Sequence, residues 1–343
     1  AGLTFWLVRP VRPHSYPAWV DSSIDGFGLL SLNTDDEGMN ALTSFILKRL
    51  SARLERQVPP NERKAVAAST TVARKTLDRL VHPEIVFLLQ SRGTGDEEAL
   101  AAVLLRNRLA VLLSATTLNE RLPGSNSTLT TDTTLALYQL RQARDGRPPA
   151  YVALANRTLI LSNSTDLISR AAERSVTPEV GEPSEELLPY MNALALDHPT
   201  PGRDLAFAAA TPPGRLMGWI AALEDLLHAQ GLTENLDSAL KARKVSLDDV
   251  EGITVSGDVT SADKVTFTIT LYGSRIETAK RLSEALRVSL NQILARIEGA
   301  AATGGLEARV DVKPLGTSVI ASFNVSGLQK LIERWIPLPE PTR

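Results

Sequence analysis

Apolar and polar residues alternate without a break along residues 265–272, which read Val-Thr-Phe-Thr-Ile-Thr-Leu-Tyr. This period of two predicts a β-strand with one face on a core and the other toward water. Residues 274–297 instead carry apolar side chains at steps of three and four, and they open with the capping-box sequence Ser-Arg-Ile-Glu. These features predict a long helix that packs one face on a sheet.

The chain after this helix returns to a period of two. Residues 306–312 and 319–325 alternate again, with a turn expected at the Pro-Leu-Gly sequence of residues 314–316, and a last helix is expected to begin near Ser326. Before residue 265 the pattern predicts strands at 205–210 and 252–259, a helix after the Pro-Pro-Gly of residues 212–214, and a helix at about 234–243.

The first half of the chain has a comparable pattern of elements. The expected strands are residues 24–32, 84–90, 133–142, 151–155 and 158–161. Four helices are expected. The first follows the capping residues 33–36, and the others cover residues 62–80, Asp96 through Leu113, and 165–174, the last behind the capping residue Ser164.

The two halves share an order of elements rather than residue identities, which predicts a degenerate internal duplication. One mismatch is that the second half has one more strand before its long helix. Strands joined by hairpin turns imply a mostly antiparallel sheet. We therefore expect an α+β fold of two pseudo-repeated halves, each a mostly antiparallel sheet covered on one face by helices.

Composition shifts give the expected boundaries. The residues from 176 to 204 are rich in Pro, Gly and Glu and include a small helix at 185–196, so they are expected to connect the halves. The predicted division is a membrane-proximal stub and linker (1–19), a first α+β half (20–175), the connection (176–203), a second α+β half (204–336) and a Pro-rich tail (337–343).

Composition excludes some classes of protein. The chain has 343 residues, of which 43% are hydrophobic, as expected for a globular protein. Its net charge of -2 argues against a nucleic-acid surface, which is normally basic. With 0 cysteines, disulfides and thiolate metal sites are excluded.

The first eight residues are apolar and are followed by Arg9 and Arg12. Eight residues cannot span a bilayer, but they fit the end of a spanning helix with Trp6 and the arginines at the interface. The alternative is an ordinary buried N-terminus. The two arginines favour a cytoplasmic domain by the positive-inside tendency.

Sequence motifs for catalysis are missing from the chain. It contains no phosphate loop, no dinucleotide-binding glycine pattern, no nucleophile elbow and no His-Glu-x-x-His, and the nearest glycine pair, Gly93 and Gly95, precedes acidic residues. The 4 histidines are far apart in sequence: His14, His82, His198 and His228. We therefore assign no catalytic, cofactor-binding or metal-binding residue, and we expect no cofactor.

Acidic clusters are the main candidates for carboxylate chemistry. They are Asp35-Asp36-Glu37, Asp96-Glu97-Glu98, Glu185-Glu186 and Asp248-Asp249. The first three fall at expected helix starts, where negative charge is stabilised by the helix dipole, so a structural role is preferred. A glycosidase-like pair drawn from two of them remains open without distances.

Asparagines and tryptophans have a structural and a functional interpretation. The glycosylation pattern occurs at Asn126, Asn156, Asn163 and Asn324, for which we prefer turn asparagines and strand threonines. Trp19, Trp219 and Trp335 are interpreted as packing residues rather than ligand stackers. The tail Trp-Ile-Pro-Leu-Pro-Glu-Pro is interpreted as a solvated end, with partner binding in extended form as the alternative.

The predicted hairpin and helix of residues 151–168 read Tyr-Val-Ala-Leu-Ala-Asn-Arg-Thr-Leu-Ile-Leu-Ser-Asn-Ser-Thr-Asp-Leu-Ile. This element resembles one found in a group of bacterial exported proteins of unknown function. The group has an N-terminal membrane anchor and a duplicated α+β ectodomain. The resemblance in sequence is confined to this hairpin and helix. In the rest of the chain only the order of helices and strands is similar. It implies an anchored extracytoplasmic domain and transfers no catalytic residue.

These observations lead to one preferred function and two alternatives. We expect a non-catalytic, membrane-tethered module on the extracytoplasmic face of a bacterial membrane, which binds another envelope or membrane protein or helps assemble a complex, and which binds no nucleic acid. The alternatives are a hydrolase that uses carboxylates such as Asp35, Asp36, Asp96 and Glu97, and a carrier with an apolar pocket of roughly 300 Å³ or more.

Overall fold

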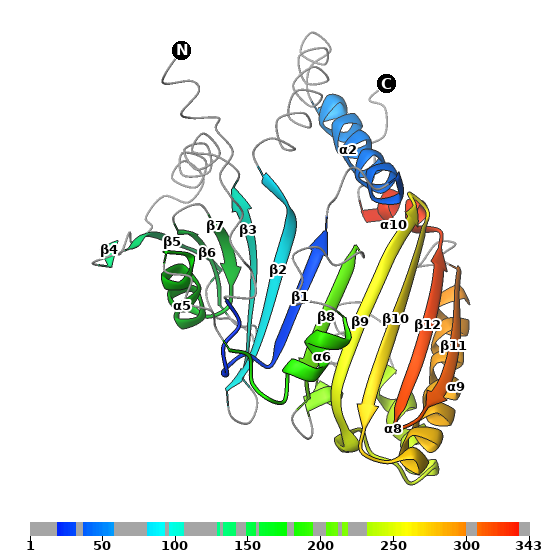
Figure 1. Ribbon diagram of the computed structural model, residues 1–343. Coiled ribbons are helices and arrows are strands. Elements are labelled where there is room, and N and C mark those ends of the chain that lie inside the picture. Colours follow the sequence, from blue (N-terminus) through cyan, green and yellow to red (C-terminus); the bar gives the residue numbers. More distant parts are fainter. Residues whose placement is uncertain are drawn as a thin grey trace. The chain divides into compact units, whose positions relative to one another are not determined.

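The protein has an α+β fold with extensive antiparallel sheet (Figure 1). The structure is a computed structural model, and it describes residues 19–31, 37–57, 81–92, 96–105, 129–130, 133–141, 149–155, 158–176, 182–194, 204–211, 215–218, 232–299 and 307–335. The chain divides into two compact units. Unit 1 comprises Ala1–Leu32 and Val72–Pro201, and unit 2 comprises Asn33–Thr71 and Gly202–Arg343.

The sheet of unit 1 is antiparallel, with the strand order β1-β2-β3-β7-β6-β5-β4. Its strands are β1 (Gly26–Ser31), β2 (Val81–Arg92), β3 (Asp96–Leu105), β4 (Leu129–Thr130), β5 (Thr133–Arg141), β6 (Ala150–Ala155) and β7 (Thr158–Ser162). The described residues of this unit also form helix α5 (Thr165–Val176) and the short helix α6 (Leu188–Ala193).

Alternating apolar side chains build the core of unit 1. Phe27 of β1 pairs with Leu88 of β2, which pairs in turn with Leu100 of β3, and all three are buried. Helix α5 packs against β7, β3, β5 and β6. As predicted, Ser164 caps this helix, because its Oγ accepts a hydrogen bond from the Leu167 amide at 3.2 Å.

The predicted helix from Asp96 through Leu113 is wrong, since residues 96–105 form strand β3. Acidic residues followed by Ala and Leu are typical of a helix start, but Leu100, Ala102 and Leu104, which alternate along the strand, are buried in the sheet. Tertiary packing has overridden the helix propensity of this stretch. Strand β3 pairs with β2 on one side and with β7 on the other.

The strands of unit 2 pair antiparallel in the order β11-β12-β10-β9-β8. Its strands are β8 (Leu205–Ala210), β9 (Val250–Ser261), β10 (Lys264–Gly273), β11 (Glu307–Leu315) and β12 (Ser318–Ser326). Its helices are α2 (Glu37–Gln57), α8 (Leu232–Ala242), α9 (Ile276–Gly299), α10 (Leu328–Trp335) and the 3-10 helix η2 (Leu247–Asp249).

The predicted core face of residues 265–272 is confirmed in unit 2. Leu271 is buried in a core that also contains Leu282 and Leu286 of α9, and Phe267 and Ile269 pack against it. Helix α9 packs against β10, β11 and β12, and α8 packs against α9 (Figure 1). The intervening residues of β10 are half-buried on the opposite face.

Element ends in unit 2 differ slightly from the predictions. Pro314 and Leu315 belong to β11, so the hairpin turn consists of Gly316 and Thr317 rather than residues 314–316. Gly316 has a positive φ of 61°, which suits the first central position of a type II′ turn. The helix predicted at residues 62–80 and most of the helix predicted after residue 214 lie outside the described residues.

Candidate functional site

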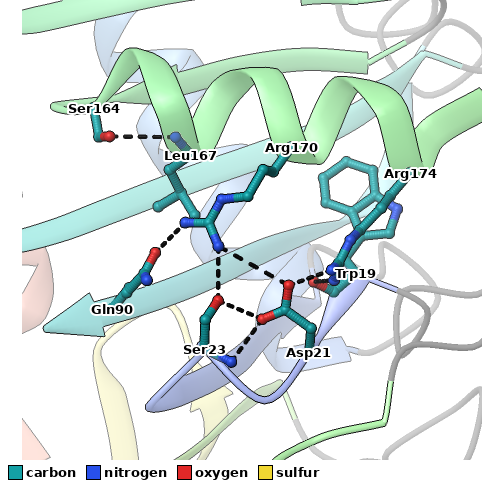
Figure 2. Close-up of polar contacts among 8 residues, drawn as sticks. All are labelled: Trp19, Asp21, Ser23, Gln90, Ser164, Leu167, Arg170 and Arg174. Atoms are coloured by element: carbon teal, nitrogen blue, oxygen red, sulfur yellow. Dashed lines mark hydrogen bonds and ion pairs between the residues drawn. The ribbon is translucent and has the colours of Figure 1, made fainter. Parts of the chain in front are cut away.

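A polar cluster of unit 1 joins helix α5 to the segment before β1 (Figure 2). Arg170 and Arg174 lie four residues apart on α5, so their side chains project from the same helix face. Arg174 forms an ion pair with Asp21 and donates a hydrogen bond from Nη1 to the Trp19 carbonyl at 3.0 Å. The Nη1 atom of Arg170 lies 3.9 Å from the same Asp21 carboxylate.

Ser23 and Gln90 complete the cluster. The Ser23 amide donates to Asp21 Oδ1 at 2.8 Å, and its hydroxyl also contacts that oxygen. The Ser23 hydroxyl accepts from Arg170 Nη1 at 2.7 Å, and the other terminal nitrogen of Arg170 donates to the Gln90 side chain. Both guanidinium groups are therefore used in fixing residues 19–25 and β2 to α5.

Asp21 is held in its charged form by this environment. Burial alone would raise the pKa of its carboxyl group, but hydrogen bonds from Ser23 and the charges of Arg174 and Arg170 outweigh burial and lower the pKa below its ordinary value. A carboxylate held charged between two arginines is a poor general acid or base at neutral pH. We therefore assign this cluster a structural role.

A surface groove of about 340 Å³ lies at one end of the unit 2 sheet. Its lining is mostly polar: Thr260, Lys264, Val265, Thr266, Glu307, Arg309, Asn324, Val325 and Ser326. The register brings the key groups together, because Asn324 lies opposite both Thr266 and Arg309. The groove offers cations, a carboxylate, hydroxyls and an amide. It meets the size expected of a carrier pocket, but seven of its nine lining residues are polar and only Val265 and Val325 are apolar.

The groove continues onto a wider surface, which we call the polar face. It includes alternate side chains of three neighbouring strands, on the side opposite the Phe267 core face: Thr266, Thr268 and Thr270 of β10, Ser322 and Asn324 of β12, and Glu307, Arg309, Asp311 and Lys313 of β11, with the apolar Ile320 of β12 between Thr270 and Lys313. These side chains are exposed or half-buried. The face therefore presents hydrogen-bonding groups and charges of both signs.

The acidic clusters are spread over different elements. Glu37 begins α2, and Glu185 and Glu186 lie exposed in the turn before α6. Asp35 and Asp36 lie outside the described residues. Asp96, Glu97 and Glu98 lie in β3 rather than at a helix start, which corrects the prediction for that cluster.

Asp248 and Asp249 occupy η2 and are exposed. The Ser246 Oγ accepts a hydrogen bond from the Asp248 amide at 3.1 Å, so this pair forms a capped turn before β9. A structural role agrees with this geometry.

Asn163 has the turn role preferred for it. Its Oδ1 accepts from the Ala99 amide and its Nδ2 donates to the Glu97 carbonyl, both at 2.8 Å. The amide nitrogen that a glycan would occupy is thus engaged in the fold. Asn324 lies exposed on β12, and Asn126 and Asn156 fall outside the described residues.

Trp19 is buried, with an exposed fraction of 2%, which agrees with its interpretation as a packing residue. Trp219 and three of the histidines, His14, His198 and His228, lie outside the described residues, while His82 falls in β2 and Trp335 ends α10. Within the described ranges, no group of three or more His, Asp or Glu residues is arranged to hold a metal ion.

No helix in the described part of the chain is long and apolar enough to cross a membrane. The apolar residues 1–8 lie outside that part, so the predicted membrane stub stays a prediction. Comparison with known proteins finds no matching family model and no matching curated protein.

Proposed function

We propose that this protein is a non-catalytic, membrane-tethered module on the extracytoplasmic face of a bacterial membrane, where it binds an envelope protein or helps assemble a complex. The observation that carries the binding role is the polar face of unit 2. The tether rests on the apolar residues 1–8 with Arg9 and Arg12 behind them. The extracytoplasmic side rests on the resemblance of residues 151–168 to exported proteins, and the two arginines alone favour the opposite side.

The chemistry of the polar face supports a protein partner. Thr268 and Ser322 lie directly opposite each other on β10 and β12 and provide hydroxyls that both donate and accept. Around them Arg309, Asp311 and Lys313 present charges of both signs. Such a mixture pairs with the hydrogen-bonding groups and charges of another protein surface, whereas a single sign would favour a polyanion or polycation.

We also propose that the two halves of the chain, residues 20–175 and 204–336, arose by duplication, each a mostly antiparallel sheet covered on one face by helices. In unit 1 the last strand, β7, pairs with β3 and carries β6 on its outer side; in unit 2, β12 pairs with β10 and carries β11 in the same way. Each of these last strands leads into a helix, α5 or α10.

A local contact supports the same relationship. Asn163, just after β7, bonds to the Glu97 carbonyl in β3, and Asp263, in the turn before β10, bonds to Gln329 at the start of α10. Both contacts span 66 residues of sequence. Superposition of the units in an experimental structure tests the duplication, and a mismatch in the order or direction of equivalent strands would refute it.

The binding role is tested by cross-linking the full-length protein in its native membrane, followed by purification in mild detergent and mass spectrometry. Lys264 and Lys313 lie on or beside the polar face and are exposed, so an amine-reactive cross-linker reports contacts there. We expect a partner in constant ratio, cross-linked through these lysines. Recovery of the protein from the soluble fraction alone would contradict the tether.

A variant separates specific binding from co-purification. Ser322→Arg places a large side chain at the centre of the polar face, and Gln292→Arg makes the same change at an exposed position of α9. We expect the partner to be lost with Ser322→Arg and retained with Gln292→Arg. Equal recovery with both variants, or no partner with the wild type, would overturn the proposal.

A further inference from the structure

Strand β11 forms an edge of the unit 2 sheet. Among the strands that the structure describes, it pairs with β12 alone. Leu315 and Ser318 flank the two-residue turn and lie opposite each other, which makes them a hydrogen-bonded pair. Because such pairs alternate along an antiparallel ladder, the residues at 307, 309, 311, 313 and 315 bond to β12.

The remaining residues of β11 then direct their backbone groups outward from the sheet edge. These are Ala308, Val310, Val312 and Pro314. Pro314 fits this series, since proline has no N–H and is tolerated where that group would point away from the ladder. The outward N–H and C=O groups of Ala308, Val310 and Val312 are thus placed to pair with another strand.

The exposed side chains of β11 alternate in charge. The polar face carries all four of them: Glu307, Arg309, Asp311 and Lys313. Their charges run negative, positive, negative, positive along the strand, so residues at equal distances before and after Val310 have opposite charges. In the monomer Lys313 pairs with Asp311, but both side chains stay largely exposed, at 72% and 60%. An exposed pair of this kind contributes little and can exchange partners.

We propose that β11 pairs antiparallel with β11 of a second copy of this chain, centred on Val310, to form a two-fold symmetric dimer with a continuous sheet. In this register Arg309 faces Asp311 of the second copy, and Glu307 faces Lys313. Two-fold symmetry repeats both contacts, so all four cross-strand pairs join opposite charges.

The same register satisfies the backbone. Val310 lies opposite Val310 of the second copy, and Ala308 lies opposite Val312. Each of these residues directs its N–H and C=O groups out of the sheet edge, so the two strands can hydrogen-bond to each other. Pro314 falls just beyond this paired stretch. Its position ends the ladder without removing a hydrogen bond from it.

The charge pattern also excludes neighbouring registers. A slip of two residues in one direction places Arg309 opposite Arg309 and Glu307 opposite Asp311. A slip in the other places Asp311 opposite Asp311 and Arg309 opposite Lys313. A charged edge commonly prevents association, but here the alternation of sign opposes wrong registers and favours one.

Sedimentation equilibrium of the full chain tests the dimer, which does not depend on the proposed function. We expect self-association with a Kd of about micromolar order. Arg309→Asp puts two like-charge pairs into the interface and should raise Kd about tenfold or more. The double variant R309D/D311R restores opposite charges and should return Kd close to the wild-type value. Lys330→Asp, at an exposed site on α10, is the control and should leave Kd unchanged.

The register is tested separately by a disulfide, since the natural chain has 0 cysteines. Val310→Cys places two thiols opposite each other at a distance that a disulfide spans, and mild oxidation should give a covalent dimer. Leu315→Cys, which is more exposed but lies outside the paired stretch, should cross-link far less. Three results would overturn the proposal: a protein that stays monomeric at about 100 μM, a dimer whose Kd is unaffected by Arg309→Asp, or equal cross-linking of the two cysteine variants.

Discussion

Phe267 and Phe323 lie directly opposite each other on β10 and β12, and their rings stack with centroids 4.4 Å apart and an interplanar angle of 8°. Phe323 is buried and Phe267 packs against the same core beneath α9. The pair therefore joins cross-strand packing within the sheet to the packing of the helix on it.

Phe323→Ala should lower the free energy of unfolding by about 3 to 4 kcal/mol, because it leaves a cavity and removes the ring contact. Urea unfolding monitored by circular dichroism measures the change. Ile320→Ala on the same strand, whose side chain projects to the other face and is only half-buried, is the control and should cost clearly less. Equal losses for the two variants would show that the stacked pair is not the centre of the core.

Asp21→Asn should lower the stability of unit 1 by about 1 to 2 kcal/mol at neutral pH, an estimate reduced for the partial exposure of the ion pairs. Asn cannot pair with the two guanidinium groups of Arg170 and Arg174 as a carboxylate does. Trp19 lies in the same cluster, so its fluorescence during urea unfolding follows this unit in a background in which Trp6, Trp219 and Trp335 are replaced by Phe.

The effect should depend on pH in one direction. Since the pKa of Asp21 in the folded protein is lowered, the stabilisation is fully present above its unfolded value of about 4 and is lost as the pH falls through the lower folded value. The wild type and Asp21→Asn should therefore converge in stability at acid pH. Glu185→Gln, at an exposed turn position, is the control and should leave the free energy of unfolding at neutral pH unchanged. A constant difference between wild type and D21N down to about pH 2 would contradict this account.

The sequence correctly predicted those elements in which the spacing of apolar residues coincides with the spacing of buried residues. Residues 265–272 and the Ser164 cap are examples, because both signals are local. Strand β3 was predicted as a helix because a continuous Ala/Leu run does not distinguish a buried strand from a helix. Its assignment as a strand depends on pairing with β2 and β7.

The polar cluster could not be found from one sequence. Asp21 and Arg174 are 153 residues apart, and no local pattern specifies that they meet. The spacing of Arg170 and Arg174 was a visible signal of a shared helix face, but it does not name a partner. The groove and the edge strand likewise depend on strand order, which a hydrophobic pattern does not determine.

Gly38 makes the closest approach of helix α2 to the sheet. A Cβ atom at this position would lie 1.6 Å from the Val259 carbonyl oxygen and 2.6 Å from its carbon, and both are backbone atoms. Gly38→Ala should therefore force α2 away from β9 and lower the free energy of unfolding by about 2 to 3 kcal/mol or more. Thermal unfolding and the protection of α2 amides from hydrogen exchange measure the change.

The control for this prediction is Gly218→Ala. A Cβ atom at Gly218, in the helical residues 215–218, would meet nothing within 4 Å. Because alanine is the better helix former, this variant should be neutral or stabilising by up to about 1 kcal/mol. If both alanine variants raised stability, the close contact between α2 and β9 would be refuted.

Asp263 caps helix α10 through Gln329, which lies 66 residues later in the chain. Its Oδ1 accepts a hydrogen bond from the Gln329 amide at 3.2 Å, and its carbonyl accepts one from the Leu328 amide at 3.2 Å. The predicted start near Ser326 placed α10 correctly, but its first amides are bonded by the turn between β9 and β10. A carboxylate at this end also interacts favourably with the helix dipole.

Asp263→Ala should remove the side-chain cap and cost about 1 kcal/mol, with faster hydrogen exchange concentrated in the first turn of α10. Asp263→Asn retains an acceptor oxygen and should recover most of the protection, which separates the hydrogen bond from the charge. Asp258→Ala, at an exposed position of β9, is the matched control and should leave α10 exchange unchanged. Uniform acceleration of exchange throughout unit 2 with Asp263→Ala would instead show that this residue stabilises the β9–β10 turn, with α10 depending on it only through the sheet.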